Sequence, residues 1–572
     1  MLLLLVLIGL GIAPAAFANT FYVRTDGGTA AQCTGLANAP YPGTGSNQAC
    51  AWANPMVALP PPLYGGKPQP RIAGGDTLLI GPGQYMIGLG APGADNCNTG
   101  ALGSCMLAPV PSGPSAAQPT RVLGTVCTAG QQPQLWGNRG PYSMVNLTSS
   151  SNVEVGCLEI TDHSSCVVNH CSMAGTCKGQ INVCKSTDPF AQNGIVGSDS
   201  QSVSLHDLNI HGMGNEGVRA GRLTNWSMQR MRIVGNGFAG WDNDIRNGIS
   251  TADTSNHGTI SFTNVEIGFN GCGETWPGLQ IFGCWGQNEG GYGDGLGTGP
   301  TSGNWVFESV YVHHNTQDGL DLLYADGTGS ISMDRVHAEG NAGNQLKVAG
   351  ATTITNSVVI GDCSYFSQPW SQGSGNMQLS DDCRAGGDAI AMLAGNDQHP
   401  GESSSINHVV TSTIKNNTII GEGNGLIMLS RGNPVSTVNF VSNVLYGTTN
   451  WQLARSGYPE LAGGIYYYAT TGYSAPTMNY AGNLFWNVKN GQCPSGSLCK
   501  DPQFTVSSVY AFNPLPMPTS PLIGSATAAN STTVDFRGYL RPSSVDGLTG
   551  YDIGAIQYQG MADNRIFQSN FD

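Results

Sequence analysis

Ionisable side chains are scarce in this chain, and they gather in one stretch. Only 10% of its 572 residues are charged. The densest group contains Asp294, Asp318, Asp321 and Lys347, with His314 close to them in the sequence. Carboxylates can bind Ca²⁺, and a lysine or histidine can act as a general base. These residue types predict a site that combines a cation with proton abstraction, with Asp294 and Asp318 as the metal ligands.

Three interpretations fit this group of residues. A polysaccharide lyase would use Ca²⁺ to neutralise a uronate carboxylate and a base to remove the neighbouring proton. The candidates for catalysis are Lys347, Asp318, Asp321, His314 and Arg219, and Arg246 is a further basic residue that could contact substrate. A glycoside hydrolase would need two carboxylates, about 6.5–9.5 Å apart in an inverting enzyme. In the third interpretation the Asp-Gly pairs are turn residues, and Asp321 and Lys347 form a surface ion pair of little energetic weight.

A repeated pattern of short strands must position these residues. Five units have apolar residues at an anchor, three positions later and five positions later. The units are Leu205, Leu208, Ile210; Met228, Met231, Ile233; Phe262, Val265, Ile267; Phe307, Val310, Val312; and Met333, Val336, Ala338. Four units carry Asn eight residues after the anchor, at Asn236, Asn270, Asn315 and Asn341. Units this short cannot bury their own apolar face, so they predict a solenoid.

The alternation of apolar and polar residues favours strands over helices. We therefore predict an all-β, single-stranded parallel β-helix with disulfide-stapled loop insertions and ~5 Å between its rungs. Asn at a repeated turn position would bond to the same residue one rung away. A second such ladder is predicted at Asn417, Asn443 and Asn483.

A second motif follows each turn and predicts which side chains share a face. Its apolar residues should point inward at Val218, Ile249, Leu296, Leu320 and Leu346. Because side chains alternate along a strand, the next residues should form one outward column at Arg219, Ser250, Gly297, Asp321 and Lys347. Asp321 and Lys347 would then lie about 5 Å apart on adjacent rungs, with Asp294 and Asp318 beside them.

An insertion at 271–293 is rich in aromatic residues. It contains Trp276, Trp285 and Tyr292 and is bounded by an expected Cys272–Cys284 disulfide. Aromatic rings beside a groove can stack on sugar rings, so these three residues are predicted to bind substrate. The alternative is that they form a small core for the loop itself.

The N-terminal segment and the cysteines predict export. Residues 1–18 combine an apolar run with Ala16-Phe17-Ala18, a small-x-small cleavage site, which indicates a secreted or periplasmic protein. All 16 cysteines follow this site, and in an exported chain they favour disulfides. The expected pairs are Cys33 with Cys50, Cys97 with Cys105, Cys272 with Cys284, Cys363 with Cys383, and Cys493 with Cys499. A zinc site among Cys166, Cys171, Cys177 and Cys184 is the rival interpretation of the remaining group.

Composition argues against two classes of partner. The formal net charge of −14 lacks the basic footprint of a nucleic-acid-binding protein. After the N-terminal segment, no stretch is long and apolar enough to span a membrane. We expect a monomer whose ligand is a polysaccharide.

Segments near both ends resemble a known family. Phe21-Tyr22-Val23 with Gly75-Asp76-Thr77, and the closing Asp535–Pro542 and Asp552–Ala555 segments, are similar to those of secreted right-handed parallel β-helix proteins of the pectate-lyase-like superfamily. The resemblance implies one β-helix domain over 19–560, a closing segment that caps the last coil, and a short tail at 561–572. We therefore expect an enzyme that cleaves an acidic polysaccharide, as a lyase before a hydrolase, with Ca²⁺ as the candidate cofactor. The alternative is a non-catalytic glycan-binding adhesin. The Asp-Asp pair and Gly-His-Gly of polygalacturonase-like hydrolases are missing.

Overall fold

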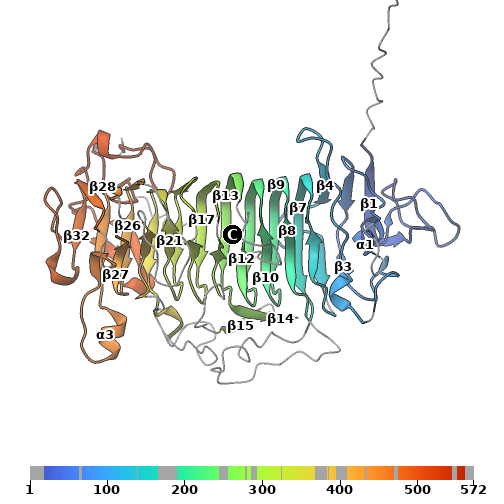
Figure 1. Ribbon diagram of the computed structural model, residues 1–572, viewed down its shortest axis with the longest axis horizontal. Coiled ribbons are helices and arrows are strands. Elements are labelled where there is room, and N and C mark those ends of the chain that lie inside the picture. Colours follow the sequence, from blue (N-terminus) through green and yellow to red (C-terminus); the bar gives the residue numbers. More distant parts are fainter. Residues whose placement is uncertain are drawn as a thin grey trace, which may run out of the picture.

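The computed structural model describes residues 18–62, 67, 69–98, 100–137, 139–164, 190–243, 256–276, 280–284, 293–299, 301–323, 325–367, 383, 386–393, 409–431, 435–468, 474–543 and 550–560. Parallel strands stack in rungs along one long axis, with the N-terminal strands at one end and the later rungs at the other (Figure 1). The predicted parallel β-helix is therefore confirmed. No helix of the described ranges is long and apolar enough to cross a membrane.

One side of the β-helix is a ten-stranded parallel sheet. Its strands are β6 (Ser143–Asn146), β8 (Asn193–Ser198), β10 (Glu216–Gly221), β12 (Ala239–Asp242), β16 (Leu296–Gly297), β18 (Leu320–Leu322), β21 (Leu346–Ala349), β24 (Ile390–Leu393), β27 (Gly425–Leu429) and β30 (Gly463–Tyr467). Arg219, Asp321 and Lys347 lie on strands of this sheet, and Asp294 and Asp318 stand two residues before β16 and β18.

The other two sides belong to one twenty-stranded sheet. Its early strands are β1 (Thr20–Gly28), β2 (Thr77–Ile80), β3 (Gln84–Ile87), β4 (Thr120–Gly124), β5 (Gln134–Gly137), β7 (Ser151–Asp162), β9 (Gln201–His211), β11 (Thr224–Val234), β13 (His257–Gly268) and β17 (Asn304–His313). Its later strands are β19 (Ser330–Asp334), β20 (His337–Glu339), β22 (Ala351–Thr355), β23 (Val358–Gly361), β25 (Thr411–Lys415), β26 (Thr418–Gly421), β28 (Thr437–Val441), β29 (Val444–Gly447), β31 (Thr477–Ala481) and β32 (Leu484–Trp486).

A left-handed residue bends nine of the rungs between these two sides. Positive φ angles occur at register-equivalent positions Cys157, Asp207, Arg230, Asn264, Ser309, Arg335, Asn356, Asn416 and Ser442. A single residue in this region turns an extended chain sharply, and non-glycine residues adopt it only rarely. The long strands β7 to β17 continue through the bend, whereas later rungs divide there into separate strands.

The repeated apolar residues form the core. Anchors Leu205, Met228, Phe262, Phe307 and Met333 are register partners on successive rungs, and all are fully buried. Both predicted asparagine ladders are also confirmed. The side-chain amide nitrogens donate to the next side-chain oxygen at 2.8–3.2 Å, through Asn236, Asn270, Asn315 and Asn341 and through Asn417, Asn443 and Asn483.

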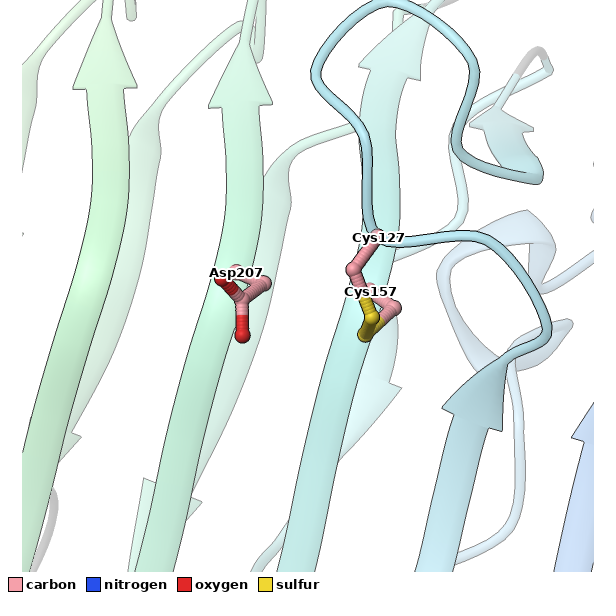
Figure 2. A group of neighbouring side chains, drawn as sticks. All are labelled: Cys127, Cys157 and Asp207. Carbon is pink, nitrogen blue, oxygen red and sulfur yellow. A yellow bond between two sulfur atoms is a disulfide. The ribbon is translucent and has the colours of Figure 1, made fainter.

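Within the described residues the five predicted disulfides are confirmed, and Cys127–Cys157 is found in addition. Figure 2 shows the two bonded sulfurs beside Asp207. The Asp207 carboxylate accepts two hydrogen bonds from Arg230, each 2.7 Å long. Cys127 and Cys157 therefore form a disulfide next to the Asp207–Arg230 ion pair. Cys166, Cys171, Cys177 and Cys184 lie outside the described residues.

Smaller elements decorate the solenoid. They are the antiparallel pairs β14 (Cys272–Thr275) with β15 (Gln280–Cys284) and β33 (Phe504–Val506) with β34 (Asn513–Pro516), and the helices α1 (Pro55–Ala58) and α3 (Trp451–Arg455).

The closing segment packs on the side of the later rungs. Its residues Phe504, Val509, Phe512, Leu522, Ile553 and Ala555 contact the outward residues Val358, Ile360, Ile420, Val444 and Leu484. These outward positions are apolar, so they need cover from water. The closing segment therefore covers the outward side of several later rungs.

Candidate functional site

The ten-stranded sheet places the predicted residues in one outward column. Register partners along it are Arg219, Asp242, Gly297, Asp321, Lys347 and Ala391. The predicted order is correct except at one rung. Trp241 and Asp242 occupy the positions expected for Ile249 and Ser250, which lie outside the described residues. Ala239, the first residue of β12, stands three residues after Asn236. Asp318 likewise stands three residues after Asn315.

Asp294, Asp318 and Asp321 bring their carboxylates together on adjacent rungs. One carboxylate oxygen from each lies within 4.8 Å of the others. The backbone fixes the first two, because Asp318 N donates to Asp294 Oδ1 at 3.0 Å and Asn344 N donates to Asp318 Oδ1 at 2.6 Å. Leu323 N donates to Asp321 Oδ1 at 2.9 Å. The three side chains are therefore held in place before any ligand arrives.

Lys347 closes this group, which we call the Asp-Lys cluster (Asp294, Asp318, Asp321 and Lys347). Its Nζ lies 3.2 Å from Asp318 Oδ2 and 2.9 Å from Asp321 Oδ2. Asp294 and Asp318 are buried, with 2% and 1% of their surface exposed, whereas 19% of the Lys347 side chain is exposed. The accessible edge of the cluster is thus the lysine.

Burial and mutual repulsion make the charges of this cluster costly. Burial, then Asp318 and Asp321, raise the pKa of Asp294 well above its ordinary value. Burial raises the pKa of Asp321 to about 6, although Lys347 opposes the change. Burial alone would lower the pKa of Lys347, but Asp318 and Asp321 raise it well above its ordinary value. Three carboxylates and one ammonium carry a net charge of −2 when all are ionised, which a divalent cation would balance.

Two glycines leave room for two of these carboxylates. A β-carbon at Gly297 would lie 2.8 Å from Asp294 Oδ2, and one at Gly343 would lie 2.3 Å from Asp318 Oδ1. Oxygen ligands from several carboxylates are what Ca²⁺ requires. The residues present therefore fit the predicted cation.

Arg219 lies on the same face but outside the Asp-Lys cluster. Its Nη1 is 2.8 Å from Glu216 Oε1 and 3.9 Å from Asp242 Oδ2. Burial, then Asp242, raise the pKa of Glu216 to about 7. Asp242 is separated from Asp321 by two register steps, or ~10 Å. Arg219 therefore belongs to a second polar group further along the sheet.

His314 lies elsewhere. Its Nδ1 is 2.8 Å from His313 Nδ1, and its ring stacks on Phe269 and contacts Tyr365. Burial, then His313, lower the pKa of His314 to about 3, so the ring is neutral. None of the contacts found for His314 within the described residues joins it to the Asp-Lys cluster.

Of the three aromatic candidates, Trp276 lies within the described residues. Trp276 stacks on His163, which stacks on Trp136, with ring centroids 3.6 and 4.4 Å apart. The Trp276 ring, next to the β14–β15 hairpin, is therefore stacked against other side chains of this protein. Trp285, Tyr292 and Arg246 lie outside the described residues.

The sequence interpretation missed Asp388. It stands two residues before β24, whose first residue Ile390 pairs with Leu346. Its backbone N donates to Asn344 Oδ1 at 3.1 Å, so it continues the series formed by Asp294, Asp318 and Asn344. The triplet Asp388-Ala389-Ile390 repeats the pattern Asp294-Gly295-Leu296, which is the signal that could have identified it.

Comparisons with known proteins found similarity to solved structures alone. No family model matches the chain, and no curated protein matches it. Similar solved structures include pectate lyase Pel9A, with 13% identity, a TM-score of 0.39, and coverage of 94% of this chain and 96% of that chain. Another is a rhamnogalacturonan lyase, with 12% identity, a TM-score of 0.33, and coverage of 86% and 91%. A third is PfbA, a surface adhesin of Streptococcus pneumoniae, with 8% identity, a TM-score of 0.30, and coverage of 74% and 88%. Similarity this low carries no argument about activity.

Proposed function

We propose that this protein is an exported carbohydrate-active enzyme that cleaves an acidic polysaccharide by β-elimination at the Asp-Lys cluster. The observation that carries the proposal is the buried group of three carboxylates with a single lysine at its accessible edge. Buried charges are normally paired. A site with surplus negative charge is suited to a divalent cation and, through it, to an acidic sugar.

Asp294, Asp318 and Asp321 would hold Ca²⁺. When bound, Ca²⁺ would supply the positive charge that neutralises a uronate carboxylate and acidifies the C5 proton of that sugar. Lys347 is the group placed to take this proton. Burial would lower the pKa of Lys347, but the neighbouring Asp318 and Asp321 side chains outweigh burial and raise it. Lys347 can therefore act as a base only when another positive charge offsets these neighbours.

The reaction balances without water. The C5–H bond and the C4–O4 bond break, a C4–C5 double bond forms, and Lys347 receives the C5 proton. The departing sugar oxygen needs a proton from a separate donor. The products are a saturated fragment and a fragment with an unsaturated end.

Carboxylate spacing favours elimination over inverting hydrolysis. An inverting pair needs about 6.5–9.5 Å between its carboxyl groups to admit a water molecule. The three aspartates have carboxylate oxygens within 4.8 Å of one another. That spacing suits shared cation ligands better than a water-activating pair.

A panel of uronate polysaccharides tests the proposal. The ultraviolet absorbance of the unsaturated end should rise with Ca²⁺ and stay flat with a chelator. Lys347→Ala and Asp318→Asn should abolish the rise, and the matched controls Lys415→Ala and Asp326→Asn should keep it. New reducing ends without absorbance would mean hydrolysis, and neither signal would mean a glycan-binding protein.

A further inference from the structure

Asp388 extends the predicted site by one rung. Successive side-chain oxygens accept the next backbone N–H along the series Asp294, Asp318, Asn344 and Asp388. Lys347 pairs in register with Ala391, three residues after Asp388. Lys347 and Asp388 therefore come from neighbouring rungs, which are ~5 Å apart.

The two carboxyl oxygens of Asp388 have different surroundings. Tyr466 donates its hydroxyl hydrogen to Oδ2 at 2.6 Å. Oδ1 is buried and has no hydrogen-bond partner among the described residues. Only 1% of Asp388 is exposed. A buried carboxyl oxygen without a partner is costly, so its orientation requires either a proton or a ligand.

Tyr466 reaches Asp388 across two rungs. It pairs in register with Met428, which pairs with Ala391 on the rung of Asp388. Gly425 makes this approach possible, because a β-carbon there would lie 2.6 Å from the Tyr466 ring. Burial, then Asp388, raise the pKa of Tyr466, so the phenol stays protonated and remains a donor. Tyr466 therefore holds Oδ2 of Asp388 by a hydrogen bond and makes none to Oδ1.

The pKa of Asp388 suits a general acid. Burial raises its pKa to about 7, although Tyr466 and the Gly425 backbone lower it. An acid with a pKa near the working pH can both hold a proton and release it. The group therefore combines a fixed orientation with an available proton below neutral pH.

We infer that Asp388 is the general acid that protonates the departing sugar oxygen during elimination. This inference rests on the proposed function. Lys347 takes the C5 proton on one side of the broken bond, and Asp388 Oδ1 gives its proton to O4 on the other. The Asp388 carboxylate that remains keeps its hydrogen bond from Tyr466 and regains a proton from solvent after product leaves.

Two other buried acids fit this role less well. Glu422 accepts hydrogen bonds on both oxygens, from Ser364 and from Tyr510. Glu216 has an oxygen without a partner, but it stands two register steps from the rung of Asp294, on the side away from Lys347. Asp388 alone among these three has a free oxygen on a rung next to Lys347.

The test compares two substrates that differ in the departing group. One is the uronate polysaccharide that the wild type cleaves. The other is a small uronate carrying an aryloxide at C4, which departs without protonation. Asp388→Asn should lower kcat on the polysaccharide by about 100-fold, in the range of general acid catalysis. It should change kcat on the aryloxide substrate less than about threefold.

The ratio of the two rates does not depend on the fraction of folded protein. Lys347→Ala should reduce both rates alike, because proton abstraction is needed for both. Glu422→Gln, a buried acid outside the site, should leave the ratio at its wild-type value. Equal losses on both substrates with Asp388→Asn would overturn the acid role while keeping the proposed function. Failure of the wild type on every uronate tested would overturn both.

Discussion

Lys347 Nζ lies 2.9 Å from Asp321 Oδ2, and the two residues are register partners on the adjacent strands β21 and β18. Asp321 is buried, so this pair is not the weak surface contact that the sequence allowed as an alternative. The lysine stabilises carboxylates that would otherwise repel one another in a region of low dielectric constant.

Loss of Lys347 should destabilise the fold. Lys347→Ala leaves the aspartates without their counter-charge, and breaking a buried pair in this way costs about 3–5 kcal/mol. The free energy of unfolding should fall by about 3 kcal/mol, measured by denaturant titration against Lys415→Ala. Adding Asp321→Asn to Lys347→Ala should recover part of the loss. Strictly additive effects of the two substitutions would contradict the coupling.

Ca²⁺ should stabilise the folded protein through the same aspartates. A ligand present at about 100 times its dissociation constant adds about 2.7 kcal/mol to the free energy of unfolding. We expect Tm to rise with Ca²⁺ in the wild type and in Asp326→Asn, and to stay constant in Asp318→Asn. An equal rise in Asp318→Asn would place the cation elsewhere. The measurement requires no knowledge of the substrate.

His211 should give stability a characteristic pH dependence. Its Nε2 is 3.1 Å from Glu159 and its Nδ1 is 3.0 Å from Glu274 in the hairpin β14–β15. Burial favours the neutral ring, but the two glutamates outweigh it and raise the pKa from 6.5 to about 9. Because the folded pKa is the higher one, this stabilisation is complete below pH 6.5 and disappears as the pH rises through about 9.

His211→Gln tests that dependence. The variant should lose the part of the stability profile that falls between these two pH values, as measured by thermal unfolding across the range. The exposed His257→Gln serves as the matched control and should follow the wild type. An unchanged slope in His211→Gln would show that the imidazolium is not the responsible group.

The asparagine ladder should be a major source of stability. Asn315 accepts from both the backbone and the side chain of Asn270, and it donates to Asn341 and to the Ile267 carbonyl. Asn315→Ala leaves these buried groups without a hydrogen-bond partner, and each unpaired group lowers the free energy of unfolding by about 1–3 kcal/mol. We expect the free energy of unfolding to fall by at least about 3 kcal/mol.

An exposed asparagine pair provides the control for the ladder. Asn479 donates to Asn439 at 2.9 Å on the exposed face of two rungs. Asn479→Ala removes one hydrogen bond where water can replace it, so its effect should stay within about 0.5 kcal/mol. Similar losses for Asn315→Ala and Asn479→Ala would mean that burial of the ladder contributes little.

The sequence predicted the features that repeat at a constant interval. The anchors and both asparagine ladders follow the rung length, because each rung must present the same residue to its neighbour. The same regularity gave the register partners Asp321 and Lys347. A solenoid makes such predictions reliable because contacts depend on the repeat alone.

The features it missed lie where an insertion or a loop breaks the interval. Asp388 stands 44 residues after Asn344, whereas Asn344 stands 26 residues after Asp318, so its place in the series could not be counted from the repeat. Trp241 lies in β12, which begins with Ala239, whereas the same motif begins with Asp, Asn or Glu on the other rungs. The sequence pattern therefore did not identify this rung. Cys127 pairs with Cys157, 30 residues away, and spacing alone does not identify so distant a partner.

The origin of the oxygen in the products distinguishes elimination from hydrolysis at the Asp-Lys cluster. Wild-type protein should be incubated with a uronate polysaccharide and Ca²⁺ in water labelled with heavy oxygen, and the fragments weighed by mass spectrometry. Elimination at the Asp-Lys cluster predicts fragments whose masses add up to that of the substrate, with no label incorporated. Fragments that carry one added labelled water would show hydrolysis and contradict the account.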